Sequence, residues 1–284
     1  MPDVDDEAAV RVTVIGAWGF VGSAFVRHLA SRGIDAVQVT RETYARLAGL
    51  ESDVVIDAAA NSKKFLAESA PFEEFDLSVS HRVRTLRDFP AELHVHVSSI
   101  DVYSDLTSSA TTREETPIDI AKTSHYGFHK RLAEQIVEHH ARRWLIVRLA
   151  GMVGPGLRKN PIYDILNGCP LRIHPDSQYQ FMHTDDMARL VWLLVEKQTA
   201  REVFNVCGEG LISPREIAAM AGCAVDGSGL DAGAVPRVVN VSGEKMRRVA
   251  RLPETLETVV TFVTERRVRV CERPDGGDLG EGDC

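Results

Sequence analysis

The sequence predicts an α/β fold, with a doubly wound parallel sheet and a small C-terminal lobe. Apolar, β-branched runs alternate with helical patterns between residues 10 and 150, which is typical of a parallel sheet covered by helices on both faces. The first run, at 11–15, leads directly into a glycine-rich turn and a helix. A chain of 284 residues is long enough for one large domain with a smaller lobe.

Composition and charge exclude several classes of protein. Hydrophobic residues make up 44% of the chain and charged residues 26%, as in ordinary globular domains. The net charge of −8 argues against nucleic acid as a partner. No stretch approaches the ~20 apolar residues of a membrane span, and the acidic N-terminus lacks the features of a signal peptide. Five scattered cysteines lack metal-ligand spacing, so we expect no metal site, reduced thiols and a cytoplasmic protein.

The glycine-rich turn after the first strand predicts a phosphate-binding site. Glycines at three-residue intervals let the backbone approach a pyrophosphate, and the amides and dipole of the following helix attract its charge. The alternative is an ordinary strand-to-helix turn with convenient glycines. The residues that we expect to contact a dinucleotide here are Gly16, Trp18, Gly19, Phe20, Val21 and Gly22. Trp18 is bulky for such a loop.

The ends of the next two strands predict how the rest of a dinucleotide is held. A fold of this kind that prefers NAD usually places a carboxylate after its second strand, where it binds the ribose 2′-hydroxyl. Here the second strand ends in Thr40 and Arg41, which suit a 2′-phosphate and favour NADP(H) over NAD(H). A solvated arginine is the alternative. After the third strand, the small residues Ala58, Ala59 and Ala60 would let the backbone lie against the cofactor.

The remaining elements follow from hydrophobic periodicity and from helix start signals. We expect further strands at 36–40, 53–57, 93–97, 144–149 and 202–206, and helices at 72–89, 126–140, 160–167, 187–195 and from 214 onward. Ser213 as N-cap and Pro214 at the first position mark the start of the last helix. We place one domain at 10–150 and a second at 151–266, from which residues 183–206 return to the sheet. Residues 1–9 and 267–284 have the composition of disordered tails.

Hydroxyl groups and a lysine occur where chemistry is expected. Binding sites of parallel sheets lie off the carboxyl ends of strands, and the fourth strand ends in Ser98 and Ser99. In the helix that follows, Tyr126 and Lys130 are four residues apart and therefore share a face. A nearby ammonium lowers the pKa of a phenol, which would make Tyr126 a usable acid or base. By itself, a Tyr-x-x-x-Lys spacing also occurs on solvated helices.

Together, these motifs resemble the extended short-chain dehydrogenase/reductases. The match runs from about residue 10 to 262 and includes the glycine turn, Tyr126-x-x-x-Lys130, and the stretches 98–103, 148–156, 181–186 and 204–206. Within that family the sequence is most similar to the NAD-dependent epimerase/dehydratase group, nucleotide-sugar subgroup. The resemblance implies a Rossmann fold, a C-terminal lobe that binds substrate, and a homodimer. It also implies that Ser99, Tyr126 and Lys130 are catalytic, and that Tyr126 and Lys130 both contact the nicotinamide cofactor.

The resemblance suggests substrate contacts and also has departures. Arg158, Lys159 and Asn160 follow a glycine turn where family members contact the diphosphate of the substrate, although a solvated loop is the alternative. Asp101 stands where sugar 4,6-dehydratases carry a glutamate, and it is a further substrate-binding candidate. Ser78 stands where the family often has an asparagine, so a water-mediated proton relay at that position is in doubt.

The resulting hypothesis is an NADP(H)-dependent enzyme that reduces a keto group on a nucleotide-activated sugar, with Tyr126 as acid/base. One alternative is a nucleotide-sugar epimerase or dehydratase that works through a transient ketone with tightly bound NAD(P). Another is a non-catalytic dinucleotide-binding protein. The expected partner is a small nucleotide sugar, and neither nucleic acid nor a membrane is expected.

Overall fold

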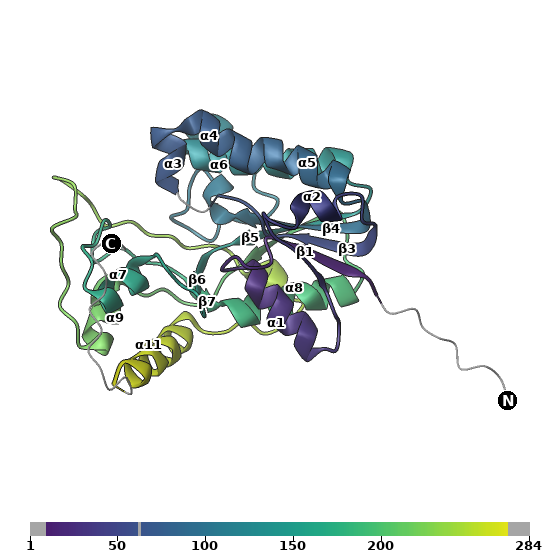
Figure 1. Cartoon of the computed structure of the whole chain (residues 1–284). Coiled ribbons are helices and arrows are strands. Elements are labelled where there is room, and N and C mark those ends of the chain that lie inside the picture. Colours follow the sequence, from purple (N-terminus) through teal and green to yellow (C-terminus); the bar gives the residue numbers. More distant parts are fainter. Residues whose placement is uncertain (1–9, 62–63, 272–284) are drawn as a thin grey trace. The chain divides into compact units, whose positions relative to one another are not determined.

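Six strands form the central sheet of the computed structural model, which describes residues 10–61 and 64–271. These are β1 (Val12–Ile15), β2 (Val37–Val39), β3 (Ser52–Asp57), β4 (Ala91–Ser99), β5 (Trp144–Leu149) and β8 (Glu202–Val206). Their order in the sheet is β2-β1-β3-β4-β5-β8 (Figure 1). Strand β1 pairs in parallel with β2 and β3, and β3 pairs in parallel with β4. The predicted parallel α/β fold is therefore confirmed.

Helices cover both faces of this sheet. Helices α1 (Gly22–Ser31) and α8 (Thr184–Glu196) lie on one face, and α5 (His81–Asp88) and α6 (His125–His140) lie on the other (Figure 1). Because both faces are covered, the strand is buried on both sides, as β1 illustrates with all four of its residues buried. One core cluster joins Ile15, Val39, Val55 and Phe89.

The helix predicted at 72–89 is divided into three parts. Helix α4 (Pro71–Phe75) begins at a proline, which is tolerated in the first turn. A π-helical turn, η1 (Asp76–Ser80), follows, and α5 then completes the segment. Such turns are frequent at functional sites. The sequence does not predict this one, because periodicity describes the apolar face and not a shift of backbone hydrogen bonds.

The described chain divides into two units that alternate along the sequence. The first contains the described residues up to Val102, then Ile120–Val147 and Ala188–Val203. The second contains Tyr103–Asp119, Arg148–Met187 and the described residues from Phe204 on. The domain bounds taken from the sequence stay a prediction.

The second unit has its own small sheet and helices. Strand β6 (Gly151–Val153) pairs in parallel with β7 (Phe181–His183). Its helices are α7 (Pro161–Asn167), α9 (Pro214–Ala221), α10 (Glu244–Arg247) and α11 (Thr255–Cys271), while the short helices of the first unit are α2 (Tyr44–Leu47) and α3 (Lys64–Ser69). Helix α9 starts as predicted, because the Ser213 hydroxyl accepts the Glu216 amide and the Glu216 carboxylate accepts the Ser213 amide in return.

Three further points concern expectations about the chain ends, thiols and membrane. Helix α11 continues to Cys271 and so includes the first residues of the tail predicted to begin at 267. The sequence contains no glycine or proline between the start of α11 and Pro274. The rest of that tail and residues 1–9 lie outside the described residues. The expectation that every thiol is reduced is wrong for Cys169, which is disulfide-bonded, because scattered spacing does not reveal contacts made in three dimensions. Within the described part of the chain, no helix has the length and apolarity to cross a bilayer.

Candidate active site

The glycine-rich turn between β1 and α1 is shaped by close backbone contacts. Gly16 has a φ of +77°, which favours glycine, and its amide donates to the Val39 carbonyl at 2.9 Å. A Cβ on Gly16 would lie 2.9 Å from the amide nitrogen of Ala59, and a Cβ on Gly22 would overlap the Gly16 carbonyl. The turn therefore requires glycine at both positions and lies directly against the Ala58–Ala60 segment.

The first turn of α1 fits an anionic group. Among the described residues, no side chain caps this helix at Val21, and its first turn contains no acidic residue. The amides of Ser23 and Ala24 already donate to the carbonyls of Gly19 and Val21, but the positive end of the helix dipole still favours a phosphate here. The tight turn and the uncapped helix together fit the pyrophosphate of a dinucleotide. Gly19, Phe20 and Val21 are at least partly exposed at this end of the sheet.

Side chains at the end of β2 border the same turn. The indole Nε1 of Trp18 donates to the Gln38 side chain at 3.2 Å, and 68% of Trp18 is exposed. The Thr40 hydroxyl contacts the Thr43 hydroxyl at 3.3 Å. Arg41 is exposed beside them, where it is free to reach an anionic ligand. Its predicted role with a 2′-phosphate stays a prediction.

The backbone turn after β3 contacts a buried ion pair that the sequence does not reveal. The guanidinium of Arg82, on α5, pairs with the Asp57 carboxylate at the end of β3, and both side chains are buried. Arg82 also donates to the Ala59 carbonyl at 3.1 Å, while the Asp57 carboxylate accepts the Ala59 amide at 3.1 Å. These bonds fix the backbone of Ala58, Ala59 and Ala60 against the glycine turn.

Helix α6 carries Tyr126 and Lys130, both of which are buried. The helix starts at Ser124, whose hydroxyl accepts the Gly127 amide at 3.1 Å. A Cβ on Gly127 would overlap the Asp101 carbonyl, so glycine allows this helix to approach the end of β4. The Lys130 ammonium lies 5.3 Å from the centroid of the Tyr126 ring. The shared face that the spacing predicts is thus present in the structure.

The sequence predicts that Lys130 lowers the pKa of Tyr126, but in the structure the pKa of Tyr126 is raised. Burial raises the pKa of the Tyr126 phenol, and the carboxylates of Asp101 and Glu74 raise it further, while a hydrogen bond with Ser99 acts in the opposite direction. Burial, followed by the charge of Arg82, lowers the pKa of Lys130 to about 8. The sequence indicated the cation beside the phenol, but neither the desolvation nor the two carboxylates.

Ser99 connects the phenol to an acidic residue at the end of β4. Its hydroxyl donates to the Asp101 carboxylate at 2.7 Å and accepts the Asp101 amide at 3.2 Å. The same carboxylate pairs with the Lys64 ammonium at 2.6 Å. Lys64 also lies 5.9 Å from the centroid of the Tyr126 ring. The structure thus places Asp101 with the catalytic candidates and adds Lys64.

A buried polar cluster lies on the other side of Lys130. The Glu74 carboxylate accepts from the Ser78 hydroxyl and pairs with the His129 ring, and all three side chains are buried. Ser78 belongs to the π-helical turn, which brings it to this carboxylate. The sequence indicates only one contact of this cluster, because Glu74 and Ser78 are four residues apart in one helical segment and therefore share a face.

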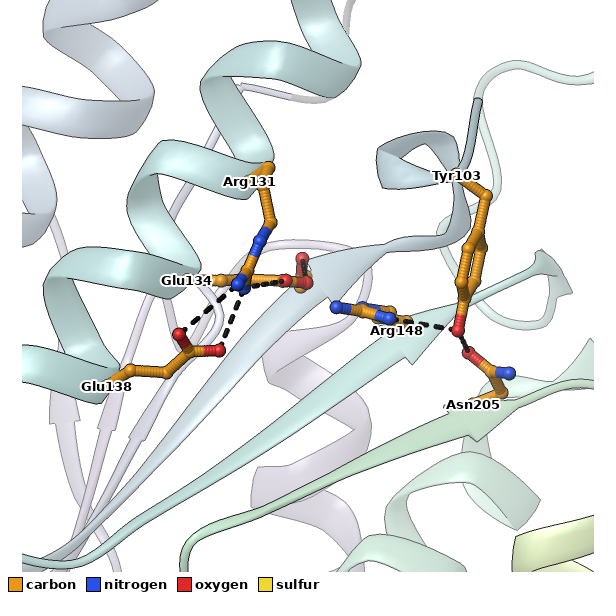
Figure 2. Close-up of polar contacts among 7 residues, drawn as sticks. Tyr103, Arg131, Glu134, Glu138, Arg148 and Asn205 are labelled. Atoms are coloured by element: carbon orange, nitrogen blue, oxygen red, sulfur yellow. Dashed lines mark hydrogen bonds and ion pairs between the residues drawn. The ribbon is translucent and has the colours of Figure 1, made fainter. Parts of the chain in front are cut away.

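Ser98, the other hydroxyl at the end of β4, has a structural partner. It donates to the Glu134 carboxylate at 2.6 Å. Arg131 binds Glu134 at 3.0 Å and Glu138 at 2.8 Å on the same helix (Figure 2). Because Glu134 is fully buried, this network fixes α6 on the sheet and leaves Ser99 as the hydroxyl that faces Tyr126.

The second unit contains a buried polar network of its own. The Arg148 guanidinium donates to the Tyr103 hydroxyl at 2.9 Å, and that hydroxyl donates to the Asn205 side chain at 2.9 Å (Figure 2). Asn205 in turn donates to the carbonyls of Thr112, at 2.7 Å, and Ser242, at 3.1 Å. These residues match motif positions in the sequence, and here they join separate segments of one unit.

The three residues predicted to contact the substrate's diphosphate also lie in the second unit. Arg158 and Lys159 are exposed. The Asn160 side chain accepts the Tyr163 amide at 2.9 Å and donates to the Met152 carbonyl at 3.0 Å, and so caps α7. Its φ of 147° is strained for a residue other than glycine. Their contact with a substrate stays a prediction. Among the described side chains, no group of three or more metal ligands is gathered.

Comparison with known proteins gives matches over most of the chain. A model of the NAD dependent epimerase/dehydratase family matches residues 12–207. The dTDP-4-dehydro-6-deoxy-D-allose reductase of Streptomyces bikiniensis is 27% identical over 266 residues, which cover 76% of this chain and 81% of the relative. The probable dTDP-glucose 4,6-dehydratase of Sinorhizobium fredii (strain NBRC 101917 / NGR234) is 25% identical over 256 residues, covering 70% and 71%.

Solved structures share the fold. MoeE5 in complex with UDP-glucuronic acid and NAD superposes with a TM-score of 0.72 at 19% identity, covering 92% of this chain and 99% of that one. RMD from Pseudomonas aeruginosa complexed with NADPH superposes with a TM-score of 0.70 at 19% identity, covering 90% and 99%. At this level of identity the likeness establishes the architecture alone.

Proposed function

This chain belongs to the NAD dependent epimerase/dehydratase family, and on that premise we propose that it reduces a keto group on a nucleotide-activated sugar with NADP(H). It is an NAD(P)-dependent enzyme of the class that modifies nucleotide sugars, as the names of its relatives indicate. The preference for NADP(H) rests on the exposed Arg41 at the end of β2, and the direction, reduction, rests on one further observation. The buried phenol of Tyr126 keeps its proton, because burial and two carboxylates raise its pKa.

A protonated phenol suits reduction better than oxidation. Reduction of a ketone leaves negative charge on the substrate oxygen, which a general acid must neutralise. Tyr126 would donate its hydroxyl proton to that oxygen, and Ser99 would supply a second hydrogen bond. Lys130 would hold the nicotinamide ribose from the next turn of the same helix. Oxidation of a sugar hydroxyl would instead need the phenolate, which this environment disfavours.

The cofactor residues follow from the fit of the glycine turn to a pyrophosphate. The backbone at Gly16, Gly19, Phe20, Val21 and Gly22 would hold the diphosphate, and the small turn after β3 would lie against the dinucleotide. Trp18, Thr40 and Arg41 would border the adenosine ribose, with Arg41 on a 2′-phosphate. When bound, the reduced nicotinamide supplies the hydride.

Substrate and assembly complete the proposal. Arg158 and Lys159 would bind the diphosphate of the nucleotide sugar, with Asn160 at the start of α7 and Asp101 near the sugar. A homodimer through the helices beside α6 is consistent with the exposed apolar side chains Phe72, on α4, and Val83, on α5. We expect the protein in the cytoplasm, with no nucleic acid or membrane partner.

An epimerase or dehydratase with tightly bound NAD(P) is the second candidate, because Asp101 places a carboxylate directly beside Ser99. The test supplies the purified full chain with a dTDP-4-dehydro-6-deoxy sugar and either NADPH or NADH. Consumption of NADPH equal to the loss of ketone is the expected result. Conversion of a nucleotide sugar without added cofactor would select the second candidate. If neither nicotinamide nucleotide binds, both proposals are wrong.

A further inference from the structure

A row of hydrogen-bonded side chains leads from the buried Tyr126 hydroxyl toward solvent within the first unit. The Tyr126 hydroxyl donates to the Asn61 carbonyl at 3.3 Å, and an interaction with the Ser99 hydroxyl lowers the pKa of the phenol. The Ser99 hydroxyl donates to the Asp101 carboxylate at 2.7 Å. Asp101 pairs with the Lys64 ammonium at 2.6 Å. Exposure rises along the row, from the buried Tyr126 and Ser99 through the Asp101 side chain at 16% to Lys64 at 63%. Each step is a group that can pass or hold a proton.

The other polar groups near Tyr126 do not offer such a gradient. Lys130 is buried, and so are Glu74, Ser78 and His129 beyond it. Ser78 already donates to Glu74, and His129 already pairs with the same carboxylate. This cluster can fix Lys130 electrostatically, but its members end in the interior, not in water.

We propose that Asp101 carries protons between solvent and Tyr126 through the Ser99 hydroxyl, and that Lys64 holds the carboxylate in place for this transfer. The inference rests on the proposed reduction, because only a phenol that gives up its proton needs to regain one. Asp101 acts through Tyr126 in this scheme and not on the sugar itself.

The proton balance of one turnover is simple. Hydride adds to the ketone carbon, and the Tyr126 O–H bond breaks as an O–H bond forms on the substrate. The phenolate then takes the Ser99 proton while Ser99 takes the proton of the Asp101 carboxyl group. Asp101 has received that proton from water or a buffer acid, so one solvent proton is consumed for each hydride. The Ser99 oxygen both donates and accepts, so the same row can carry a proton in either direction.

Two measurements on the full chain test this role. The first is kcat for reduction at low and high concentration of a small acid such as imidazolium, which can replace a lost proton carrier. Asp101→Asn keeps the shape of the carboxylate but cannot carry a proton. It should lower kcat on the order of 10²-fold at low buffer, the lower end of what acid–base groups contribute, and added buffer should restore part of the loss. Asp101→Glu, which restores a carboxylate, should have a higher kcat than Asp101→Asn at low buffer.

The second measurement needs no substrate, so it separates this inference from the proposed function. In protein labelled with carbon-13 at the tyrosine Cζ, isotope shifts in mixed light and heavy water report the exchange of each hydroxyl proton. Asp101→Asn should slow exchange at Tyr126 by about tenfold or more and leave Tyr103, in the second unit, unchanged. The variants Tyr126→Phe and Tyr103→Phe assign the two signals.

The control is Asp35→Asn, the same chemical change at an exposed aspartate of the first unit. It should match wild type in both measurements. The inference is overturned if Asp101→Asn leaves Tyr126 exchange unchanged, or if its lowered kcat does not respond to buffer, since Asp101 would then act on the sugar or only on structure. A wild-type chain that reduces no keto sugar, yet shows the exchange effect, would refute the proposed function and retain the relay.

Discussion

Two buried tyrosines, one in each unit, have nearly the same surroundings but different hydrogen bonds. Tyr126 lies 5.3 Å from the Lys130 ammonium and Tyr103 lies 4.9 Å from the Arg148 guanidinium, each measured to the ring centroid. Burial raises the pKa of both, to about 12 for Tyr103. The Tyr103 hydroxyl makes two bonds of 2.9 Å, to Arg148 and Asn205. The Tyr126 hydroxyl reaches the Asn61 carbonyl at only 3.3 Å.

The difference shows that burial and a neighbouring cation do not by themselves indicate a reactive tyrosine. A hydroxyl with two short bonds to buried partners is part of the structure, because its removal leaves those partners without a bond. A hydroxyl whose bond to a backbone carbonyl is long, as that of Tyr126 to Asn61 is, can exchange that bond for one to a substrate at little cost. The comparison therefore predicts a role in stability for Tyr103 and a role in catalysis for Tyr126, and substitutions can separate the two.

The largest expected effect is that of Tyr126→Phe on catalysis. Removal of the general acid should lower kcat for keto-sugar reduction by about 10²- to 10⁴-fold. The free energy of unfolding should change by less than about 1 kcal/mol, because the lost hydrogen bond is long. Steady-state kinetics and urea denaturation measure the two quantities. A Tyr126→Phe protein that retains full activity would contradict the catalytic role of Tyr126.

The next effect concerns the cations beside the two rings. Unfolding returns the pKa of Lys130 from about 8 to its ordinary 10.5. Between these values the unfolded chain binds the extra proton, so stability should rise with pH from about 8 to 10. At about 1.4 kcal/mol per pKa unit, the increase in the free energy of unfolding over this pH range should be smaller in Lys130→Met than in wild type, by on the order of 2 kcal/mol.

Urea denaturation at several pH values between 7.5 and 10 measures this effect, with the exposed Lys122→Met as the matched control. Arginine keeps its charge throughout this range, so the cation beside Tyr103 contributes no such slope. If wild type and Lys130→Met show parallel pH dependence, the lysine does not have the lowered pKa.

Tyr103→Phe should have the opposite pattern to Tyr126→Phe. Loss of the hydroxyl leaves Arg148 and Asn205 each without one bond in a buried site. The free energy of unfolding should fall by roughly 1 to 2 kcal/mol, while kcat measured well below the unfolding temperature should change little. A large loss of kcat in folded protein would mean that this network is also needed for chemistry.

The smallest effect is expected at a third cation, Arg41, which is exposed and adjoins neither ring. Arg41→Ala should raise KM for NADPH by about tenfold, roughly 1.4 kcal/mol, and leave KM for NADH nearly unchanged. Added salt should shrink the difference, because exposed charges are screened. Equal effects on the two cofactors would contradict a contact with the 2′-phosphate.

The fold and the grouping of Ser99, Tyr126 and Lys130 could be predicted because they depend on local patterns. Apolar runs such as β1, and the capping signal at Ser213, can be recognised from a few adjacent residues. The glycine turn is also legible, since backbone conformation and close approach restrict the residue type at Gly16 and Gly22. The parallel sheet then brings Ser99 and Tyr126 toward one end without further information.

The electrostatics of the site could not be predicted, because they depend on contacts between distant segments. Asp57 and Arg82 pair across 25 positions of the sequence, and Glu74 and His129 across 55. In a sequence such charges are taken as solvated, since isolated buried charges are costly. The raised pKa of Tyr126 follows from burial and from two carboxylates, and a four-residue spacing records neither.

The first unit is assembled from separated stretches of chain, and this has a consequence for how the protein is made. Its last stretch, Ala188–Val203, contains most of α8 and the start of the edge strand β8. A nascent chain that ends near residue 150 therefore lacks the last segment of the dinucleotide fold. We expect this unit to remain incompletely folded until β8 has emerged from the ribosome, and fragments cut near residue 150 to require the missing segment in trans.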